Sequence, residues 1–245
     1  MPVLHLQVCA GFANRVRALV AGLCAAEELK IPLVIHWPPG PDCACKALSV
    51  LDGESLPKTV KVVSEELYKP TEVLSQDDWE KLLSEWNETS DLTIKSYGIF
   101  CATDTYDEHL RRLRPSARVK EMLGRRCGSV GWSTAIGVHI RRTDNLKSIL
   151  GSPLESFLES MRKETECQFV LATDDVSVRQ ELVNEFGPRI FTPALVLSRK
   201  TEEGMVHAVV DFFALSKCSK ILGSVGSSFS EIAARYGACT LELVC

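Results

Sequence analysis

Apolar and polar positions follow two different periods along this chain, one typical of strands and one typical of helices. Residues 3–8 (VLHLQV) alternate as a strand does, and residues 14–30 carry apolar side chains at helical spacing. Residues 32–37 (PLVIHW) are rich in strand-forming side chains and stop at Pro38. A strand, a helix and a strand in this order predict a βαβ unit, which implies a parallel sheet with a right-handed crossover.

The rest of the first half carries fewer signals. Residues 40–54 have the composition of a loop, and residues 59–63 (TVKVV) predict a short strand. Residues 75–86 predict a helix in which Ser75 fills the N-cap position and acidic residues follow in the first turn.

The second half repeats the alternation of strands and helices more regularly. Strands are predicted over residues 135–140, 168–173, 189–191, 220–223 and 240–244. Helical patterns separate them over residues 153–164, 176–187, 204–218 and 227–237. Because Pro115 and Ser116 restart a helix, we place a boundary there and predict two α/β domains, 1–115 and 116–245.

Composition excludes some classes of protein. The chain has 245 residues, of which 45% are hydrophobic and 24% charged, as in an ordinary globular protein. A net charge of −4 argues against a nucleic acid as partner, although a local basic pocket remains allowed. No apolar run is long enough to span a bilayer, and no export signal is visible, so we expect a cytoplasmic chain or a trimmed luminal fragment.

Ten cysteines are more than average, but their spacing does not indicate a metal site. The sequence contains no CxxC and no HExxH motif, and the one close pair is Cys43 and Cys45. We therefore expect free, mostly buried thiols and no bound metal.

Polar residues follow four predicted strands, and this is where open parallel sheets bind their ligands. These segments are residues 11–14 (GFAN), 139–144 (HIRRTD), 173–175 (TDD) and 223–228 (GSVGSS). The last has the glycine and serine content of a turn that binds an anion at a helix start. It is neither a Walker A loop nor a dinucleotide fingerprint, so nothing supports an ATP or NAD site.

Two adjacent arginines at the end of a buried strand need an explanation. If the strand extends through Arg141, then His139 and Arg141 share one face, and Arg142 points to the other. A guanidinium suits bidentate binding of a phosphate, and Asp144 can hold one arginine in place, so a diphosphate is the ligand that this arrangement suits best. A surface arginine–aspartate pair of little energetic value is the alternative from chemistry alone.

A resemblance to a known family favours the first interpretation. The segments GVHIRRTD (137–144), FVLATDD (169–175) and DFFALSKCSKILGSVGSSFSEIA (211–233) resemble the three motifs of fucosyltransferases that form α-1,6 linkages or modify protein O-sites, including the nodulation enzymes. The segment GFANRVRALVAGLCAAEELKIPLVIHWPP (11–39) resembles the start of such enzymes. The resemblance implies a GT-B fold, in which two Rossmann-like domains face each other. The second domain would hold GDP-fucose, and the first would serve the acceptor.

The resemblance also implies roles for individual residues. Arg141 matches the arginine on the donor diphosphate, where it would stabilise the departing GDP without a metal. The other donor-binding residues implied are Asn14, His139, Arg142, Asp144, Asp211, Ser227, Ser228 and Phe229. Within this set, Asn14 and Arg142 would contact phosphate, Asp144 would support an arginine, and the remaining residues would contact the guanine nucleotide.

Most of these residues have a simpler interpretation as well. His139 and Phe229 can be core residues, and Asp211 can be a solvated helix residue. Asn14 can be the N-cap of its helix, and the aspartates of residues 174–175 can cap the helix that follows them.

The predicted function is therefore an inverting, metal-independent transfer of a sugar, fucose from GDP-fucose, to a glycan, peptide or small-molecule acceptor, with no cofactor. A sugar-nucleotide-binding protein without transferase activity is the alternative, and a hydrolase that uses Asp174 and Asp175 has less support. Some relatives carry a glutamate just after the motif aspartate, but residues 145–152 (NLKSILGS) contain none. The general base is thus unassigned, and the nearest downstream carboxylate is Glu155, on a predicted helix.

Overall fold

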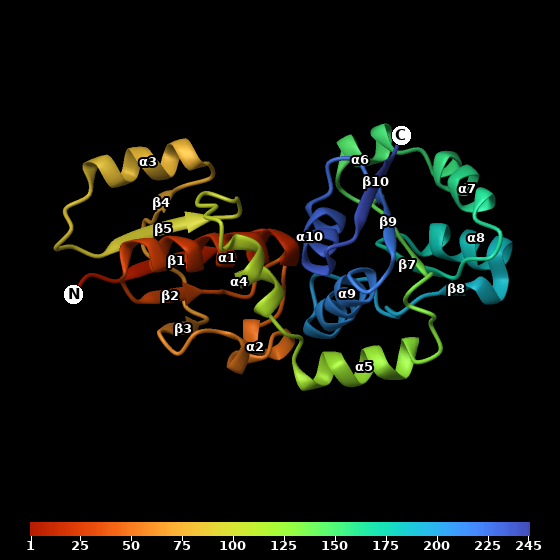
Figure 1. The fold of residues 1–245 in the computed structure, drawn as a ribbon, viewed down its shortest axis with the longest axis horizontal. Coiled ribbons are helices and arrows are strands. Elements are labelled where there is room, and N and C mark those ends of the chain that lie inside the picture. Colours follow the sequence, from red (N-terminus) through yellow and green to blue (C-terminus); the bar gives the residue numbers. More distant parts are fainter. The chain divides into compact units, whose positions relative to one another are not determined.

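The computed structural model describes residues 1–245, which form two compact units, Met1–Ser116 and Ala117–Cys245. Each unit is built around its own five-stranded sheet in which every pair of neighbouring strands is parallel (Figure 1). This confirms the predicted α/β class. The division lies one residue beyond the boundary predicted at Pro115.

The strands of the first unit are β1 (Leu4–Val8), β2 (Leu33–His36), β3 (Val60–Val63), β4 (Thr71–Glu72) and β5 (Leu92–Ser96), in the sheet order β3-β2-β1-β5-β4. Its helices are α1 (Phe12–Leu29), α2 (Ala47–Val50), α3 (Gln76–Glu85) and α4 (Tyr106–Arg112), with a 3₁₀ turn at Gly53–Ser55. The sequence interpretation missed β5, which pairs with β1 in this sheet. It also treated residues 40–54 as loop, where α2 and the 3₁₀ turn lie.

The two faces of the first sheet differ in chemistry. Leu4, Leu6 and Val8 of β1 are fully buried on the face that α1 covers. Gly22 of α1 permits this close approach, because a Cβ there would lie 2.5 Å from Leu6 Cδ2. The opposite face carries polar side chains, and Gln7 Oε1 accepts a hydrogen bond from Leu67 N at 2.7 Å. The alternation seen in β1 therefore reflects one apolar and one polar face.

Helix α3 begins as the sequence predicts. Ser75 and Asp78 form a reciprocal capping box, in which Ser75 Oγ accepts from Asp78 N and the Asp78 carboxylate accepts from Ser75 N. Trp79 is buried and its ring lies 5.3 Å from that of Phe100, which anchors the helix to the unit.

The strands of the second unit are β6 (Ile136–Ile140), β7 (Phe169–Thr173), β8 (Ile190–Phe191), β9 (Lys220–Ser224) and β10 (Thr240–Val244), in the order β10-β9-β6-β7-β8. Its helices are α5 (Ala117–Cys127), α6 (Leu146–Gly151), α7 (Leu154–Lys163), α8 (Val176–Phe186), α9 (Glu202–Leu215) and α10 (Ser228–Gly237), with a 3₁₀ turn at Gly187–Arg189. Both sheets place their first strand in the middle, with the next two strands on one side and the last two on the other. The second sheet follows the strand order of a Rossmann fold, whereas in the first sheet the last two strands, β4 and β5, have exchanged places.

Helices cover both faces of the second sheet. Helices α7 and α8 lie on one face and α9 and α10 on the other (Figure 1). On β6, Ile136, Val138 and Ile140 belong to the core under α7 and α8. Gly137 points the other way, because a Cβ there would lie 2.9 Å from Leu215 of α9. By the same alternation His139 lies on the face of the sheet that α9 and α10 cover.

All ten cysteines are free thiols, and six of them are buried. Burial raises the pKa of the Cys101 thiol to about 12 and that of Cys127 to about 11. These two thiols therefore act as small apolar side chains rather than as nucleophiles. None of the helices is long and apolar enough to cross a bilayer.

Candidate functional site

The second sheet brings three of the predicted segments to one edge. Strand β6 lies between β7 and β9, and His139 is level with Ala172 on one side and with Gly223 on the other. The segments that follow the three strands therefore leave the sheet at the same edge, as the rule for parallel sheets requires. Strand β6 ends at Ile140, so Arg141 belongs to the turn that follows it. The sequence interpretation, which extends the strand through Arg141, places it one residue too far.

Arg141 is held by two carboxylates. Its Nη2 donates to Asp144 Oδ1, and its Nη1 lies 3.0 Å from Asp174 Oδ2. Its backbone N–H donates to Ser224 Oγ at 3.1 Å, which joins this turn to the end of β9. The guanidinium side chain is 19% exposed, so it is mostly enclosed yet reachable by a ligand.

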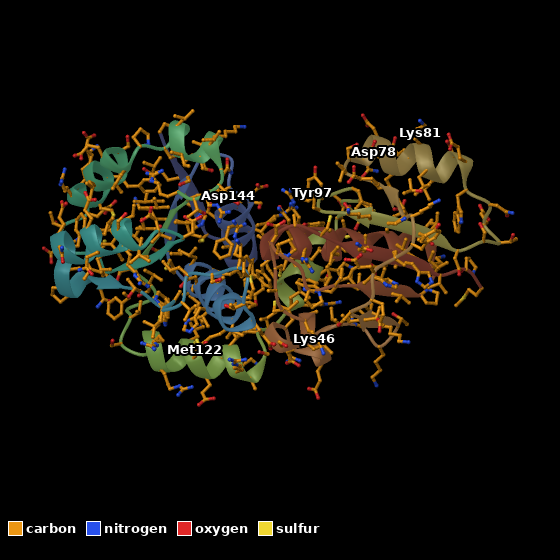
Figure 2. All side chains as sticks on the ribbon, turned by 180° about the vertical axis from the view of Figure 1, so that it is seen from behind. Lys46, Asp78, Lys81, Tyr97, Met122 and Asp144 are labelled. Atoms are coloured by element: carbon orange, nitrogen blue, oxygen red, sulfur yellow. The ribbon has the colours of Figure 1, made fainter.

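Asp144 lies at the surface of this unit, in the turn between β6 and α6 (Figure 2). Its Oδ2 accepts from Arg199 Nη2 at 2.5 Å, so the carboxylate binds an arginine with each oxygen. Partial burial opposes ionisation, but the hydrogen bonds from Arg199 and Arg141 outweigh it and hold the pKa of Asp144 below its usual value. The predicted support of an arginine by Asp144 is thus present, and the arginine concerned is Arg141.

The two neighbouring aspartates after β7 have different roles. Asp175 is the N-cap of α8 and accepts from Ser177 N at 2.7 Å and from Val178 N at 3.2 Å. Asp174 instead accepts from Arg142 N at 2.7 Å and from Thr143 Oγ1 at 2.7 Å. Helix capping therefore accounts for Asp175 alone, while Asp174 fixes the turn that carries the arginines.

Arg142 binds backbone carbonyls rather than Asp144. Its Nη2 donates to the Ser152 carbonyl at 2.7 Å and its Nη1 to the Arg141 carbonyl at 3.3 Å. It is half-buried, and its guanidinium connects the turn after β6 to the end of α6. This position makes Arg142 a structural link as well as a candidate phosphate ligand.

The glycine and serine turn after β9 is fastened to α6. Ser148 Oγ donates to the Val225 carbonyl at 2.7 Å, and Val225 N donates to Ser152 Oγ at 2.8 Å. Gly226 adopts a φ of 70°, which other residues rarely accept, and its carbonyl accepts from Asn145 Nδ2 at 3.2 Å.

Helix α10 begins directly after this turn. Ser227 is at the N-cap position but makes no side-chain capping hydrogen bond, and it is half-buried together with Ser228 and Phe229. The hydroxyl groups and first N–H groups of this helix start are suited to an anionic ligand.

His139 and Phe229 form one face of a candidate base pocket. Their rings stack at 4.9 Å between centroids with an interplanar angle of 30°. His139 is 5% exposed, and its Nδ1 has no hydrogen-bond partner. Burial, with a further contribution from Arg141, lowers the pKa of His139 to about 4, so the ring is neutral at physiological pH. Buried polar atoms of core residues are normally hydrogen-bonded, so the unpaired Nδ1 does not fit a histidine that serves only the core.

Asp211 lies on α9 and is not the solvated helix residue that we had considered. It is 5% exposed, and its Oδ1 accepts from Ala194 N at 3.0 Å. Burial raises the pKa of this carboxyl well above its usual value. The next residue, Phe212, contacts Phe229 edge-on at 5.7 Å between centroids.

Asn14 belongs to the first unit. Helix α1 begins at Phe12 and its N-cap is Gly11, so the interpretation of Asn14 as the N-cap is wrong. Its Oδ1 is buried without a hydrogen-bond partner. The neighbouring Arg15, which sequence reasoning missed, is 4% exposed and donates to the Ala10 carbonyl at 2.8 Å and to the Pro38 carbonyl at 2.7 Å.

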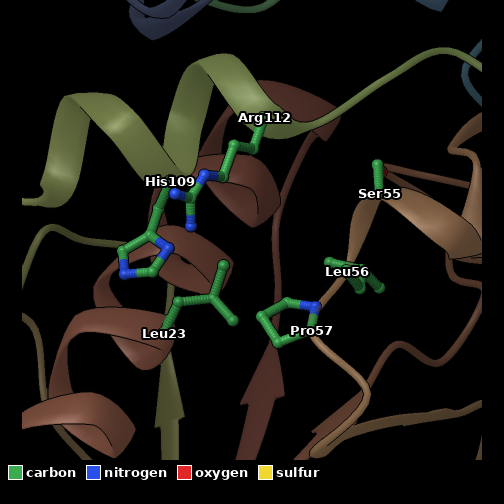
Figure 3. A pocket seen from close by; sticks show the side chains of 6 residues that line it. All are labelled: Leu23, Ser55, Leu56, Pro57, His109 and Arg112. Atoms are coloured by element: carbon green, nitrogen blue, oxygen red, sulfur yellow. The ribbon is translucent and has the colours of Figure 1, made fainter.

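The first unit also contains a pocket of about 220 Å³, and none of its lining residues is a predicted site residue (Figure 3). Leu23, Leu56 and Pro57 give it apolar walls, and His109 and Arg112 of α4 add polar groups. His109 Nε2 lies 2.8 Å from Glu27 Oε2, and Arg112 pairs with Glu108, so both side chains already have partners. We assign no role to this pocket.

Two further residues bear on the assignments made from the sequence. Arg199, which contacts Asp144, lies in an irregular segment with no motif signal and was missed. Glu155, the nearest carboxylate downstream of the motif, is paired with Arg162 at 2.8 Å on α7, which leaves it poorly suited to act as a base.

Comparison with known proteins finds its matches among solved structures. No family model and no curated protein matches the sequence. The NodZ α-1,6-fucosyltransferase soaked with GDP-fucose superimposes with a TM-score of 0.72 at 15% identity, covering 96% of this chain and 93% of that one. Arabidopsis thaliana FUT1 in complex with GDP gives 0.68 at 11% identity, covering 99% and 70%. POFUT1 with GDP gives 0.63 at 12% identity, covering 99% and 98%. At these identities the likeness establishes the shared fold.

Proposed function

We propose that this chain is a glycosyltransferase that transfers fucose from GDP-fucose to a hydroxyl group of a glycan, peptide or small molecule. The observation that carries the proposal is the set of groups at the end of β6, where the enclosed Arg141 lies next to the glycine and serine turn and the stacked His139 and Phe229. The fold supports it, because the solved structures that share it are named fucosyltransferases and were determined with GDP or GDP-fucose.

In this proposal the second unit binds the donor at the carboxyl ends of its strands. Arg141 binds the diphosphate, helped by Arg142 and by the start of α10 at Ser227 and Ser228. The guanine base enters beside Phe229 and His139, and Asp211 accepts hydrogen bonds from the ring N–H and amino groups. The phosphate contact that the resemblance implies for Asn14 stays a prediction.

The reaction exchanges one bond at the sugar for another. The acceptor oxygen attacks C1 of fucose with inversion, the bond from C1 to the diphosphate oxygen breaks, and GDP leaves with the bonding electrons. Arg141 stabilises the negative charge that grows on the leaving oxygen, an interaction stronger in the transition state than in the ground state. No divalent metal takes part in this scheme, and the base that receives the acceptor proton is unassigned.

The first test is the choice of nucleotide. The melting temperature should rise more with GDP than with UDP, ADP or CMP, because only guanine offers Asp211 two adjacent donors. A ligand at about one hundred times its Kd stabilises the folded protein by about 2.7 kcal/mol, which a thermal-shift assay resolves easily. The GDP response should survive EDTA. An equal response to all four nucleotides, or a GDP response that EDTA abolishes, would contradict the proposal.

The second test separates transfer from binding alone. Incubation with GDP-fucose should release GDP, slowly by hydrolysis and faster when a suitable glycan or peptide is present. GDP binding without any GDP release would instead support the alternative, a sugar-nucleotide-binding protein without transferase activity.

A further inference from the structure

Two arginines from separate segments converge on the carboxylate of Asp144. Arg141 donates to Oδ1 from the turn after β6, and Arg199 donates to Oδ2 at 2.5 Å from the segment between β8 and α9. The Arg199 side chain is 32% exposed, and its one ion-pair partner, Asp144, is itself 47% exposed. A guanidinium has five N–H donors, so Arg199 keeps most of its hydrogen-bonding capacity for a ligand.

The segment that carries Arg199 is held firmly against one face of α9. Ala194 N donates to Asp211 Oδ1 at 3.0 Å, and Leu195 N donates to His207 Nδ1 at 3.1 Å. Gly204 belongs to the same face, because residues 204, 207 and 211 are spaced at one and two helical turns.

Close packing at Gly204 fixes the position next to Arg199. A Cβ on Gly204 would lie 1.9 Å from the Ser198 carbonyl oxygen, so only glycine lets this backbone come so near the helix. From the side of α8, Arg179 Nη1 donates to the Ala194 carbonyl at 3.1 Å. The position of the backbone at Arg199 is therefore set by these contacts, and Asp144 holds its guanidinium.

Two of the three arginines of this cluster are placed to bind an anion. Arg141 pairs with Asp144 and Asp174, Arg199 pairs with Asp144, and Arg142 lies near Asp174 and Asp175. Arg142 is occupied by backbone carbonyls, but Arg141 and Arg199 approach the same anion from two sides. Two guanidinium groups that already share a carboxylate can share a phosphate in the same way, because both anions present paired oxygens.

We propose that Arg199 is a second cation of the donor diphosphate site, binding the phosphates together with Arg141. Asp144 orients both guanidinium groups by accepting one hydrogen bond from each. The inference rests on the proposed function, since it assumes that a nucleoside diphosphate binds at the end of β6. Asp211 then has a second role, because the carboxyl that we assign to the guanine base also accepts from Ala194 N and so anchors the segment that carries Arg199.

The test compares the loss of Arg199 with the loss of its neighbour. Lys200 is exposed and carries the same charge on the same segment, so Lys200→Ala controls for long-range electrostatics. Isothermal titration with GDP should show affinity about 10- to 100-fold lower for Arg199→Ala, the range expected for lost hydrogen bonds to a charged group. Arg199→Lys should recover part of the loss, and Lys200→Ala should stay within about 2-fold of wild type.

Guanosine serves as the control ligand, because it keeps the base and lacks the diphosphate. Its affinity, measured by competition against GDP, should be the same in Arg199→Ala and wild type. An equal loss of guanosine and GDP affinity in Arg199→Ala would mean that the base pocket is damaged, and it would overturn the assignment. So would a GDP affinity of Arg199→Ala equal to that of Lys200→Ala.

A double-mutant cycle distinguishes direct binding from an effect through Asp144. In the Asp144→Asn background, Arg199→Ala should still weaken GDP by about 10-fold or more if the guanidinium touches the phosphates. If its effect disappears in that background, Arg199 acts only by holding Asp144, and the inference fails. If wild-type protein does not bind GDP at all, the proposed function fails and the inference with it, whereas tight GDP binding with a silent Arg199→Ala overturns the inference alone.

Discussion

The buried ring of His139 predicts a specific loss of stability in acid. Burial is the main cause of its lowered pKa, Arg141 adds to the effect, and Asp174 opposes it, with a folded-state value of about 4 against 6.5 for an exposed histidine. Because the unfolded chain binds this proton more tightly, the free energy of unfolding falls as the pH drops from about 6.5 to 4. On a two-state basis the loss between about pH 7.5 and pH 5 is about 2 kcal/mol, since one pKa unit corresponds to about 1.4 kcal/mol.

Urea unfolding at several pH values, for wild type and for His139→Phe, isolates this contribution. Phenylalanine keeps a ring against Phe229 but cannot bind a proton, and His139→Gln provides a second variant without a titrating group. Burial also lowers the pKa values of His5 and His207, but these residues are unchanged in the variants, so their contributions cancel in the difference. The difference between wild type and variant should change by about 2 kcal/mol over this pH range. A difference that stays constant would refute the burial argument for His139.

Three further predictions concern turnover, proton linkage and packing. In steady-state kinetics with GDP-fucose, Arg141→Ala should lower kcat by about 100-fold, and Arg141→Lys should recover part of this loss. Arg142→Ala should change donor affinity or protein stability more than kcat. The carboxyl of Asp211 has a raised pKa in the free protein, and guanine donors prefer its ionised form, so GDP binding should release a proton and strengthen as the pH rises. Calorimetric titrations in buffers of different ionisation enthalpy measure this proton release. Asp211→Asn should abolish it and leave the affinity for pyrophosphate unchanged. Gly204→Ala should destabilise the protein by about 1–3 kcal/mol because its Cβ meets backbone, while Gly124→Ala, on an open helix surface, should stabilise it by about 0.5–1 kcal/mol, both measured by urea unfolding.

Most of the fold could be predicted because the periodicity of each long element is strong. The strands of the second half and the helix after Ser75 appear within a residue or two of their predicted ends. Strand β5 was missed although residues 92–96 (LTIKS) alternate buried and half-buried positions, because only Leu92 and Ile94 in it are apolar and it follows a polar stretch. Its neighbours β1 and β4 hold it in the sheet, and pairing of this kind between distant segments leaves no local signal.

Residues of the candidate site could be predicted only where a charged or polar side chain stands at the end of a predicted strand. The residues of the HIRRTD segment could be found because charged side chains at the end of a buried strand are unusual. Arg199 could not, since it lies in an irregular segment whose course is set by Asp211, His207 and Gly204 through contacts with backbone atoms. Such contacts depend on the packing of α9, which sequence patterns do not describe.

The two arginines make different contacts, and an extended strand is not the cause. We derived their opposite directions from an extended strand through Arg141, whereas β6 ends at Ile140. The turn is instead shaped by Asp174, which accepts from the backbone N–H of Arg142 and pairs with the guanidinium of Arg141. Asp174 reaches this position because Thr173 is level with Ile140 in the parallel register of β6 and β7. The different contacts of the two arginines therefore depend on a carboxylate that follows the neighbouring strand, and an argument from one strand alone does not include it.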